Sequence, residues 1–183
     1  MSKKAYALFG GSFDPPHLGH KEIIQKALEL VDGVIVVPTF LNPFKKSFSA
    51  PPKKRLEWAK QSFNLPNVII SDYEIKQNRP VYTIETFRAL GQKYPISSII
   101  IGADNLKTLE KWYNFKELNE SVEWIIATRG NEELNTSKLK NFRVITVAQD
   151  ISSSEIRTGK KLEFLDEKIK QEVLDEYKLT TTR

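Results

Sequence analysis

Residues 10–20 read Gly-Gly-Ser-Phe-Asp-Pro-Pro-His-Leu-Gly-His and contain both histidines of the chain, His17 and His20. An apolar run at residues 5–9 precedes this segment, and an amphipathic stretch at residues 22–28 follows it. The pattern predicts a strand that ends in a glycine- and proline-rich turn, after which a helix begins at or near His17.

Such a turn is suited to bind phosphate. Glycines let the backbone approach a ligand closely, and the free N–H groups of a helix N-terminus attract an anion. Two imidazoles one helical turn apart project toward the same place. We therefore predict a phosphate site in which His17 and His20 are the side-chain donors.

Two other interpretations of the histidine pair stay open at this point. A structural zinc site normally takes four ligands from Cys and His, and with no Cys and no third His only carboxylates could complete it. We expect no metal bound by the protein itself. The second alternative is that the histidines have no ligand role, since a short motif can occur by chance. The chain contains neither the Gly-x-x-x-x-Gly-Lys-Ser/Thr nor the Gly-x-Gly-x-x-Gly phosphate motif.

The rest of the chain alternates strand-like and helical patterns. Strands are predicted at residues 6–9, 34–37, 68–71, 99–101, 123–127 and 144–147. Helices are predicted at residues 18–30, 53–63, 83–94 and 166–177, with a short helical segment at 106–112. Nearly continuous apolar strands between amphipathic helices predict an α/β fold, a doubly wound parallel sheet with helices on both faces.

Sheets of this kind bind their ligands beyond the carboxyl ends of the strands. The turn at residues 10–20 lies at the end of the first predicted strand, and Gly102-Ala103-Asp104 directly follows the fourth. The longest irregular stretch, residues 39–52, carries Lys45 and Lys46. Loops of that length are usually functional lids or disordered.

The composition limits the class of protein. A length of 183 residues fits one domain, residues 1–183, and 40% apolar with 28% charged residues is ordinary for a globular protein. No apolar run is long enough to span a membrane, and the absence of Cys suits a cytoplasmic protein. The net charge of +5 suits small polyanionic substrates as well as nucleic acid, so it does not decide between them.

Two segments resemble the signatures of the nucleotidylyltransferase superfamily. Residues 11–20 resemble its His-x-Gly-His signature, and residues 151–157, Ile-Ser-Ser-Ser-Glu-Ile-Arg, resemble its Ile-Ser-Ser-Thr-x-Ile-Arg signature. Ser154 replaces the usual Thr and keeps the hydroxyl. The resemblance implies a Rossmann-like fold and transfer of a nucleotidyl group from a nucleoside triphosphate, with Mg²⁺ carried by the phosphates. His17, His20 and Arg157 are then the expected catalytic residues. The expected ATP-binding residues are Gly10, Gly11, Ser12, Phe13, His17, His20, Lys45, Gly102, Asp104, Ser152, Ser153, Ser154 and Arg157.

The middle of the chain resembles the bacterial nicotinate mononucleotide adenylyltransferases. Residues 79–87 are similar to their Ser-Tyr-Thr-x-x-Thr-Leu segment, and residues 100–106 and 111–114 to their Ile-Ile-Gly-x-Asp-x-Leu segment and Trp-Tyr pair. This resemblance implies that ATP and nicotinate mononucleotide are the substrates, in the biosynthesis of NAD. It implies that Trp112 stacks on the pyridine ring, that backbone amides near Thr83 and Tyr113 bind the carboxylate, and that Gly102 and Asp104 contact the nucleotides. From the residues alone, Trp112 could instead be core and Thr83 a helix cap.

One loop departs from the family pattern. Phe44 stands where the family commonly has His before Lys, and Asn42–Lys46 also looks like the loop of phosphopantetheine adenylyltransferases, which are our alternative. Tyr82-Thr83 and Trp112 count against that alternative.

A non-catalytic nucleotide- or nucleic-acid-binding module would show Lys and Arg clustered with exposed aromatics, whereas the charges here are spread. We expect no nucleic-acid or membrane partner, and the sequence leaves the oligomeric state open.

Overall fold

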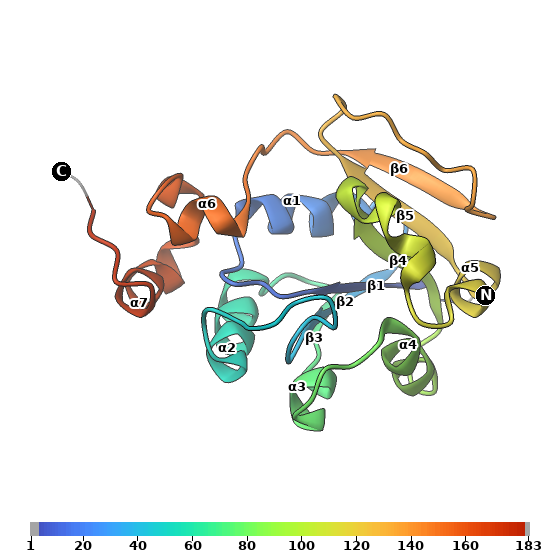
Figure 1. Cartoon of the computed structure of the whole chain (residues 1–183), viewed down its shortest axis with the longest axis horizontal. Helices are drawn as coiled ribbons and strands as arrows, with labels where there is room; N and C mark the ends of the chain where they lie inside the picture. Colours follow the sequence, from blue (N-terminus) through green and yellow to red (C-terminus); the bar gives the residue numbers. More distant parts are fainter. Residues whose placement is uncertain (1–3, 182–183) are drawn as a thin grey trace.

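A six-stranded parallel sheet forms the centre of the fold in the computed structural model, which describes residues 4–181 (Figure 1). The strands are β1 (Tyr6–Gly11), β2 (Gly33–Pro38), β3 (Val68–Ile70), β4 (Ile96–Gly102), β5 (Glu123–Thr128) and β6 (Phe142–Thr146). Their order is β3-β2-β1-β4-β5-β6, and every neighbouring pair is parallel. This order defines the Rossmann-like doubly wound sheet. The predicted fold class and all six predicted strands are confirmed, with β4 beginning three residues earlier than expected.

Helices cover both faces of the sheet. The helices are α1 (Leu18–Ala27), α2 (Pro52–Ser62), α3 (Tyr73–Gln77), α4 (Thr83–Gly91), α5 (Phe115–Ser121), α6 (Ser153–Arg157) and α7 (Glu167–Glu176). Side chains of α1 and α2, such as Ile24 and Ala59, pack with Phe9 and Val36 on one face of the sheet. Those of α4 and α5, such as Ile84, pack on the opposite face. A third apolar cluster joins α2 to α6 and α7.

Several helical predictions differ from the structure in length or kind. The predicted helices at 18–30 and 83–94 end earlier, at Ala27 and Gly91. The predicted helical segment at 106–112 forms two 3₁₀ helices, η1 (Ala103–Lys107) and η2 (Leu109–Lys111). A third, η3, spans Leu162–Phe164. The sequence analysis did not predict α3 and α5, because five and seven residues are too few to show a clear helical period.

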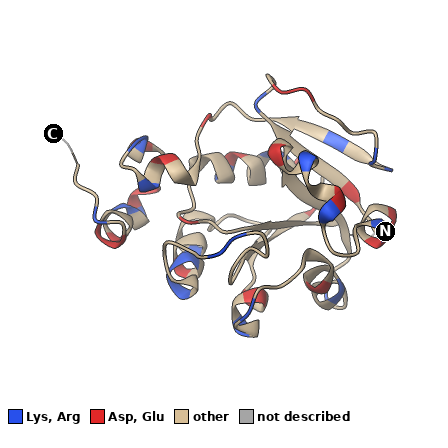
Figure 2. Ribbon diagram, viewed as in Figure 1, with Lys and Arg blue, Asp and Glu red and all other residues tan. Residues whose placement is uncertain are grey.

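The surface of the fold carries mixed charge. Figure 2 shows Lys and Arg interspersed with Asp and Glu over the outer helices. Most ion pairs on these helices join exposed side chains, such as Lys60 with Glu57 and Lys76 with Asp72. Within residues 4–181, no helix is both long enough and apolar enough to cross a membrane.

Candidate active site

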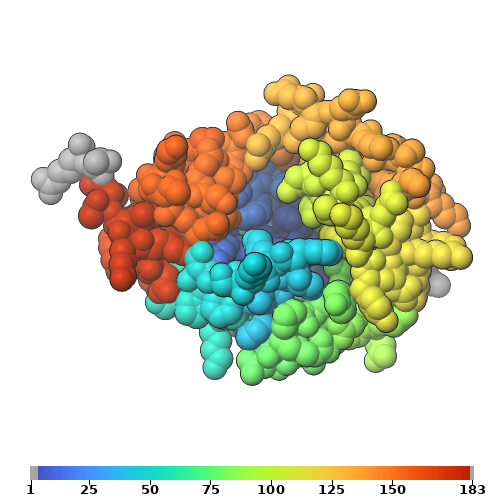
Figure 3. Space-filling view, viewed as in Figure 1, coloured from blue at the N-terminus to red at the C-terminus, as the bar shows by residue number. Residues whose placement is uncertain are grey.

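A cavity of about 780 Å³ opens above the carboxyl ends of β1, β4 and β5. It lies where the strand order reverses between β1 and β4, which is the usual ligand site of such sheets. Figure 3 shows the hollow in the middle of the molecule, with N-terminal residues at its floor. Most of the predicted site residues line it: Gly10, Gly11, Phe13, His17, His20, Thr83, Gly102, Asp104, Trp112, Tyr113, Ser152 and Ser153.

A smaller pocket of about 100 Å³ lies beside this cavity, and Ser12, Lys45 and Arg157 line it. Two residues, Thr39 and Asn42, line both spaces. Ser154 lines neither pocket, although its hydroxyl touches Arg157. The structure therefore brings all predicted site residues except Ser154 to the walls of two adjoining spaces.

The two histidines begin α1 and cap each other. His17 is the N-cap residue: its Nδ1 accepts a hydrogen bond from the backbone N–H of His20 at 3.3 Å. His20 Nδ1 in turn accepts from the backbone N–H of His17 at 3.2 Å. The rings are stacked with their centroids 3.7 Å apart. Because both Nδ1 atoms accept, the hydrogen of each neutral ring is on Nε2, which is free to donate to a ligand.

Burial keeps both imidazoles neutral. Burial and, to a smaller extent, the charge of Arg129 lower the pKa of His17 to about 4, with Glu155 opposing the change. Burial also lowers the pKa of His20 well below its ordinary value, and the neighbouring His17 adds to the effect. At neutral pH the pair therefore supplies uncharged N–H donors rather than cations.

Aromatic packing and the close approach of Ile151 at Gly19 fix the positions of the two histidine rings. Phe13 packs edge-on against His20 with centroids 4.9 Å apart, and Phe63 packs against Phe13. A Cβ atom at Gly19 would lie 2.7 Å from the side chain of Ile151 and 2.9 Å from the His17 ring. Glycine is therefore required between the histidines, because residue 151 of the second signature packs directly against it.

The second signature is bonded to the backbone of the first. Ser153 Oγ donates to the carbonyl oxygen of Pro15 at 2.8 Å, and Arg157 Nη1 donates to that of Asp14 at 2.7 Å. Ser152 caps α6, accepting from the N–H of Glu155 and donating to its carboxylate. The hydroxyl hydrogens of Ser152 and Ser153 are thus donated within the protein. The backbone N–H of Ser152 also donates to the Glu155 carboxylate, at 2.9 Å, so in this arrangement only the backbone N–H of Ser153 remains to bind a phosphate.

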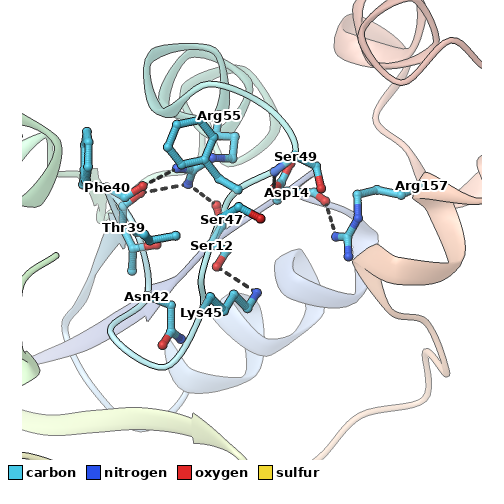
Figure 4. A pocket seen from close by; sticks show the side chains of 12 residues that line it. Ser12, Asp14, Thr39, Phe40, Asn42, Lys45, Ser47, Ser49, Arg55 and Arg157 are labelled. Atoms are coloured by element: carbon cyan, nitrogen blue, oxygen red, sulfur yellow. Dashed lines mark hydrogen bonds between the residues drawn. The ribbon is translucent and has the colours of Figure 1, made fainter. Parts of the chain in front are cut away.

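Three cationic side chains surround the smaller pocket (Figure 4). Lys45 Nζ donates to Ser12 Oγ at 3.1 Å, and Arg157 lies beside Asp14. Burial lowers the pKa of Lys45, and repulsion from Arg157 contributes to the same direction. The third cation, Arg55, is fully buried and donates to four backbone carbonyls, those of Ser12, Thr39, Phe40 and Ala50.

The sequence analysis missed Arg55 and Asp14. Asp14 accepts from the N–H groups of Ser49 at 2.7 Å and Ala50 at 2.9 Å, and from the hydroxyl of Tyr177. Together, Asp14 and Arg55 fix both ends of the loop at residues 39–52, while its middle, residues 43–49, is exposed. A signal for Arg55 exists in the sequence, because it has helical spacing with the buried residues Trp58, Ala59 and Ser62.

The far end of the cavity is aromatic. Trp112 lines it and packs edge-on against Trp124, with centroids 6.1 Å apart. Tyr113 is 61% exposed and lies beside Tyr82 at 5.0 Å. Thr83 is the first residue of α4, whose N-cap is Tyr82 rather than Thr83. A further carboxyl group that the sequence analysis missed, Glu74, is buried in the wall at this end.

Gly102 and Asp104 lie between the two ends, at the end of β4. A Cβ atom at Gly102 would lie 2.6 Å from Asp104 Oδ1, so glycine leaves room for this carboxylate close to the backbone. Asp104 is exposed toward the cavity that it lines.

Comparison with known proteins places this fold and site in a family. The family described as cytidylyltransferase-like matches residues 8–159, and the chain belongs to it. The chain is 46% identical to the probable nicotinate-nucleotide adenylyltransferase of a Sulfurovum species, over 94% of each chain. It is 44% identical to that of a Nitratiruptor species, over 94% of this chain and 98% of the relative. Within the cytidylyltransferase-like family, the chain is therefore a member of the nicotinate-nucleotide adenylyltransferases.

The fold also matches solved structures of a nicotinic acid mononucleotide adenylyltransferase. The nicotinic acid mononucleotide adenylyltransferase of Plasmodium falciparum, complexed with NaAD, superposes with a TM-score of 0.79 at 19% identity. The match covers 96% of this chain and 97% of that one. The family resemblance stated from the motifs is confirmed, and the phosphopantetheine alternative gains no support from these relatives.

Proposed function

We propose that this enzyme transfers the adenylyl group of ATP to nicotinate mononucleotide, forming nicotinate adenine dinucleotide and pyrophosphate, as a step in NAD biosynthesis. One observation carries the proposal. A single cavity joins a pair of neutral histidine donors at one end to an aromatic wall with free backbone N–H groups at the other. The names of the relatives support the same reaction.

The reaction is an in-line attack by the phosphate of the mononucleotide on the α-phosphorus of ATP, with pyrophosphate as the leaving group. A phosphate monoester is already mostly ionised at pH 7, since its second pKa is about 6, so no general base is needed. The histidine pair fits this requirement, because both Nδ1 atoms are engaged and only the Nε2–H groups face outward. Catalysis then rests on positioning and on neutralising the charge of the phosphoryl oxygens.

The smaller pocket is suited to the leaving group. Lys45 and Arg157 both line it, and no carboxylate other than Asp14 does so within the described residues. Asp14 is occupied by three donors, so it offers little unshared negative charge. We assign Lys45 and Arg157 to the β- and γ-phosphates. The backbone N–H group of Ser153 and the glycines of β1 would bind the phosphates from the cavity side.

The acceptor end offers a planar surface and two unused donors. The backbone N–H groups of Thr83 and Tyr113 donate to no acceptor within residues 4–181. They would bind the nicotinate carboxylate, since hydrogen bonds to an ionised acceptor are stronger than neutral ones. Trp112 would stack on the pyridine ring, which carries positive charge in the mononucleotide. Gly102 and Asp104 would contact the two nucleotides between these ends.

We propose that Mg²⁺ enters on the phosphates of ATP. Within the described part of the chain, no three His, Asp or Glu side chains are grouped so as to hold a metal ion. This fits a cation carried by its substrate, which Mg²⁺ commonly is at nucleotide sites. The ion would neutralise part of the triphosphate charge, and the protein would position the complex.

The test is to offer ATP and Mg²⁺ with each candidate acceptor and to identify the product by mass spectrometry. Nicotinate mononucleotide should give the dinucleotide and pyrophosphate. Nicotinamide mononucleotide lacks the charge that the two N–H groups bind, so its kcat/KM should be at least about tenfold lower, near 1.4 kcal/mol. Phosphopantetheine should give no product. Turnover of phosphopantetheine with none of nicotinate mononucleotide would refute the proposal.

A further inference from the structure

Glu74 presents an unshared carboxyl oxygen to the cavity. The residue lies on α3, is only 5% exposed and lines the cavity. Its Oε1 accepts a hydrogen bond of 2.6 Å from the hydroxyl of Thr86. Its Oε2 has no hydrogen-bond partner among residues 4–181, yet it is not one of the fully enclosed polar atoms without a partner. This oxygen therefore keeps some accessible surface, in a residue that lines the cavity.

Among residues 4–181, no cation is paired with this carboxyl group. The strand beneath α3, β2, contributes Gly, Val, Ile and Pro only. On α4, Glu85 is paired with Arg79 at 2.7 Å, and on α3 Lys76 is paired with Asp72 at 2.9 Å. Arg88, also on α4, is paired with Glu117. Of the other titratable groups, Tyr73 lies on α3, whereas Tyr82, Tyr113 and Asp104 line the cavity.

Two further observations describe the charge at this end. Among the described residues that line the cavity, the one Lys or Arg is Arg129, and it lies at the nucleotide end beside Ile151. Burial raises the pKa of Glu74 to about 7, with Glu85 adding to the rise and the Thr86 hydrogen bond opposing it. Near neutral pH the group therefore exists in both its neutral and its ionised form.

The position of Glu74 relates it to the acceptor. Its partner Thr86 lies three residues after Thr83, on the same face of α4 and one turn along. Thr83 carries one of the two N–H groups that we assign to the acceptor carboxylate. A ligand carboxylate bound there would lie close to the free oxygen of Glu74.

We propose that Glu74 is a specificity-determining residue that accommodates the ring carboxylate of the acceptor only as a neutral acid, donating a hydrogen bond from Oε2. This rests on the proposed function. Ionised Glu74 repels a carboxylate in a place without a compensating cation. It does not repel the carboxamide of nicotinamide mononucleotide, whose NH₂ group can donate to it.

Binding of the two acceptors then depends differently on pH. Nicotinate mononucleotide binds with uptake of one proton by Glu74, so its kcat/KM falls as the pH rises above about 7. Nicotinamide mononucleotide binds without that uptake. The phosphate group titrates identically in both acceptors, and the His17 pKa of about 4 lies well below this window. The ratio of the two kcat/KM values isolates the titration of Glu74.

The experiment measures this ratio from about pH 6 to about pH 8.5 in the full-length protein with ATP and Mg²⁺. In the unmodified protein, the preference for nicotinate mononucleotide should fall by up to about tenfold per pH unit above 7. Glu74→Gln cannot ionise, but its amide can still donate to a carboxylate. This variant should keep turning over nicotinate mononucleotide, and the ratio should no longer change with pH.

Two further variants control the result. Glu132→Gln removes another carboxylate of the same cavity, which is bonded to Thr128 and to the N–H of Arg129 at the nucleotide end. It should retain the pH dependence of the unmodified protein. Thr86→Val removes the hydrogen bond that favours ionised Glu74, so the fall should shift to higher pH. This shift tests the proposal even if Glu74→Gln does not fold.

Two outcomes would overturn the inference while leaving the proposed function intact. One is a pH-independent ratio in the unmodified protein, and the other is an unchanged pH dependence in Glu74→Gln. Absence of turnover with both mononucleotides, by contrast, would refute the proposed function, and the inference would fall with it.

Discussion

The two ends of the cavity are built in different ways. At the phosphate end, backbone groups of one continuous segment fix the two histidines, and the second signature is bonded to the same backbone through Ser153 and Arg157. At the acceptor end, Glu74, Thr83 and Trp112 come from three separate segments and meet only through the packing of α3, α4 and η2. The first end is a local structure, whereas the second is a product of the tertiary fold.

The two ends of the cavity also differ in the chemical groups that they present to a ligand. The phosphate end combines neutral donors with the cations Lys45 and Arg157, as a triphosphate requires. The acceptor end has an aromatic wall, free N–H groups and one buried acid. Variants at one end should therefore leave the KM for the substrate bound at the other end unchanged, which gives a direct way to test the comparison.

The largest effect is expected at the histidine pair. Replacing His17 or His20 with Ala removes a donor to the transition state, which typically costs ~3–4 kcal/mol, or roughly 10²–10³ in kcat. Steady-state kinetics should show this loss. His17→Asn should restore the helix cap, worth about 1 kcal/mol, without restoring full turnover. Nearly normal kcat in both folded Ala variants would refute the assignment of the phosphate site.

The same pair should make the fold sensitive to acid. The pKa of His17 is lowered from 6.5 to about 4. The contribution of its neutral imidazole to the free energy of unfolding is therefore complete above about pH 6.5 and is lost as the pH falls toward 4. The loss from His17 amounts to about 3 kcal/mol in the free energy of unfolding. Urea unfolding at several pH values should show it. His17→Asn should be less acid-sensitive, and an equal acid sensitivity in both proteins would contradict the neutral, buried imidazole.

A smaller effect is expected at Trp112. Trp112→Ala should raise the KM for the mononucleotide by a stacking contribution of roughly 0.5–2 kcal/mol, while the KM for ATP stays the same. Because Trp112 also packs on Trp124, Trp112→Phe serves as a control that keeps an aromatic ring in place. If only the ATP parameters change, Trp112 belongs to the core and not to the acceptor site.

The smallest effect is expected at Lys45, whose side chain lies on an exposed part of its loop. Lys45→Gln keeps a donor for Ser12 but removes the charge. The KM for ATP should rise by a factor of about two to five, on the order of 0.5–1 kcal/mol, and the effect should weaken with added salt. An effect confined to the mononucleotide would show that the loop serves the acceptor end instead.

The sequence predicted the sheet and the phosphate end because both depend on short-range patterns. The central strands β2, β4 and β5 are largely buried apolar runs, and residues 10–20 contain the turn, the cap and both histidines in one segment. The aromatic wall was found through family resemblance, since Thr83 and Trp112 carry no local signal that separates a binding role from packing.

Other parts of the site depend on contacts that no local pattern shows. Glu74 is one of two charged residues in the short helix α3, and only the packing of α3 against the sheet buries it. Arg55 is one of several basic residues at the start of α2, and its role appears only when the loop at residues 39–52 folds over it. The hydroxyls of Ser152 and Ser153 are bonded within the protein, which their place in a signature could not indicate.

The contacts of the Asp14 carboxylate determine how late in synthesis this part of the site can be completed. Its partners are Ser49 and Ala50, 35 and 36 residues later, and Tyr177, 163 residues later. During synthesis the ribosome delivers the histidine turn early and Tyr177 only after α7 has been translated, and long-range contacts of this kind form slowly. A nascent chain that has already formed β1 and α1 therefore still lacks the contact between Asp14 and Tyr177, which can form only after α7 has been translated.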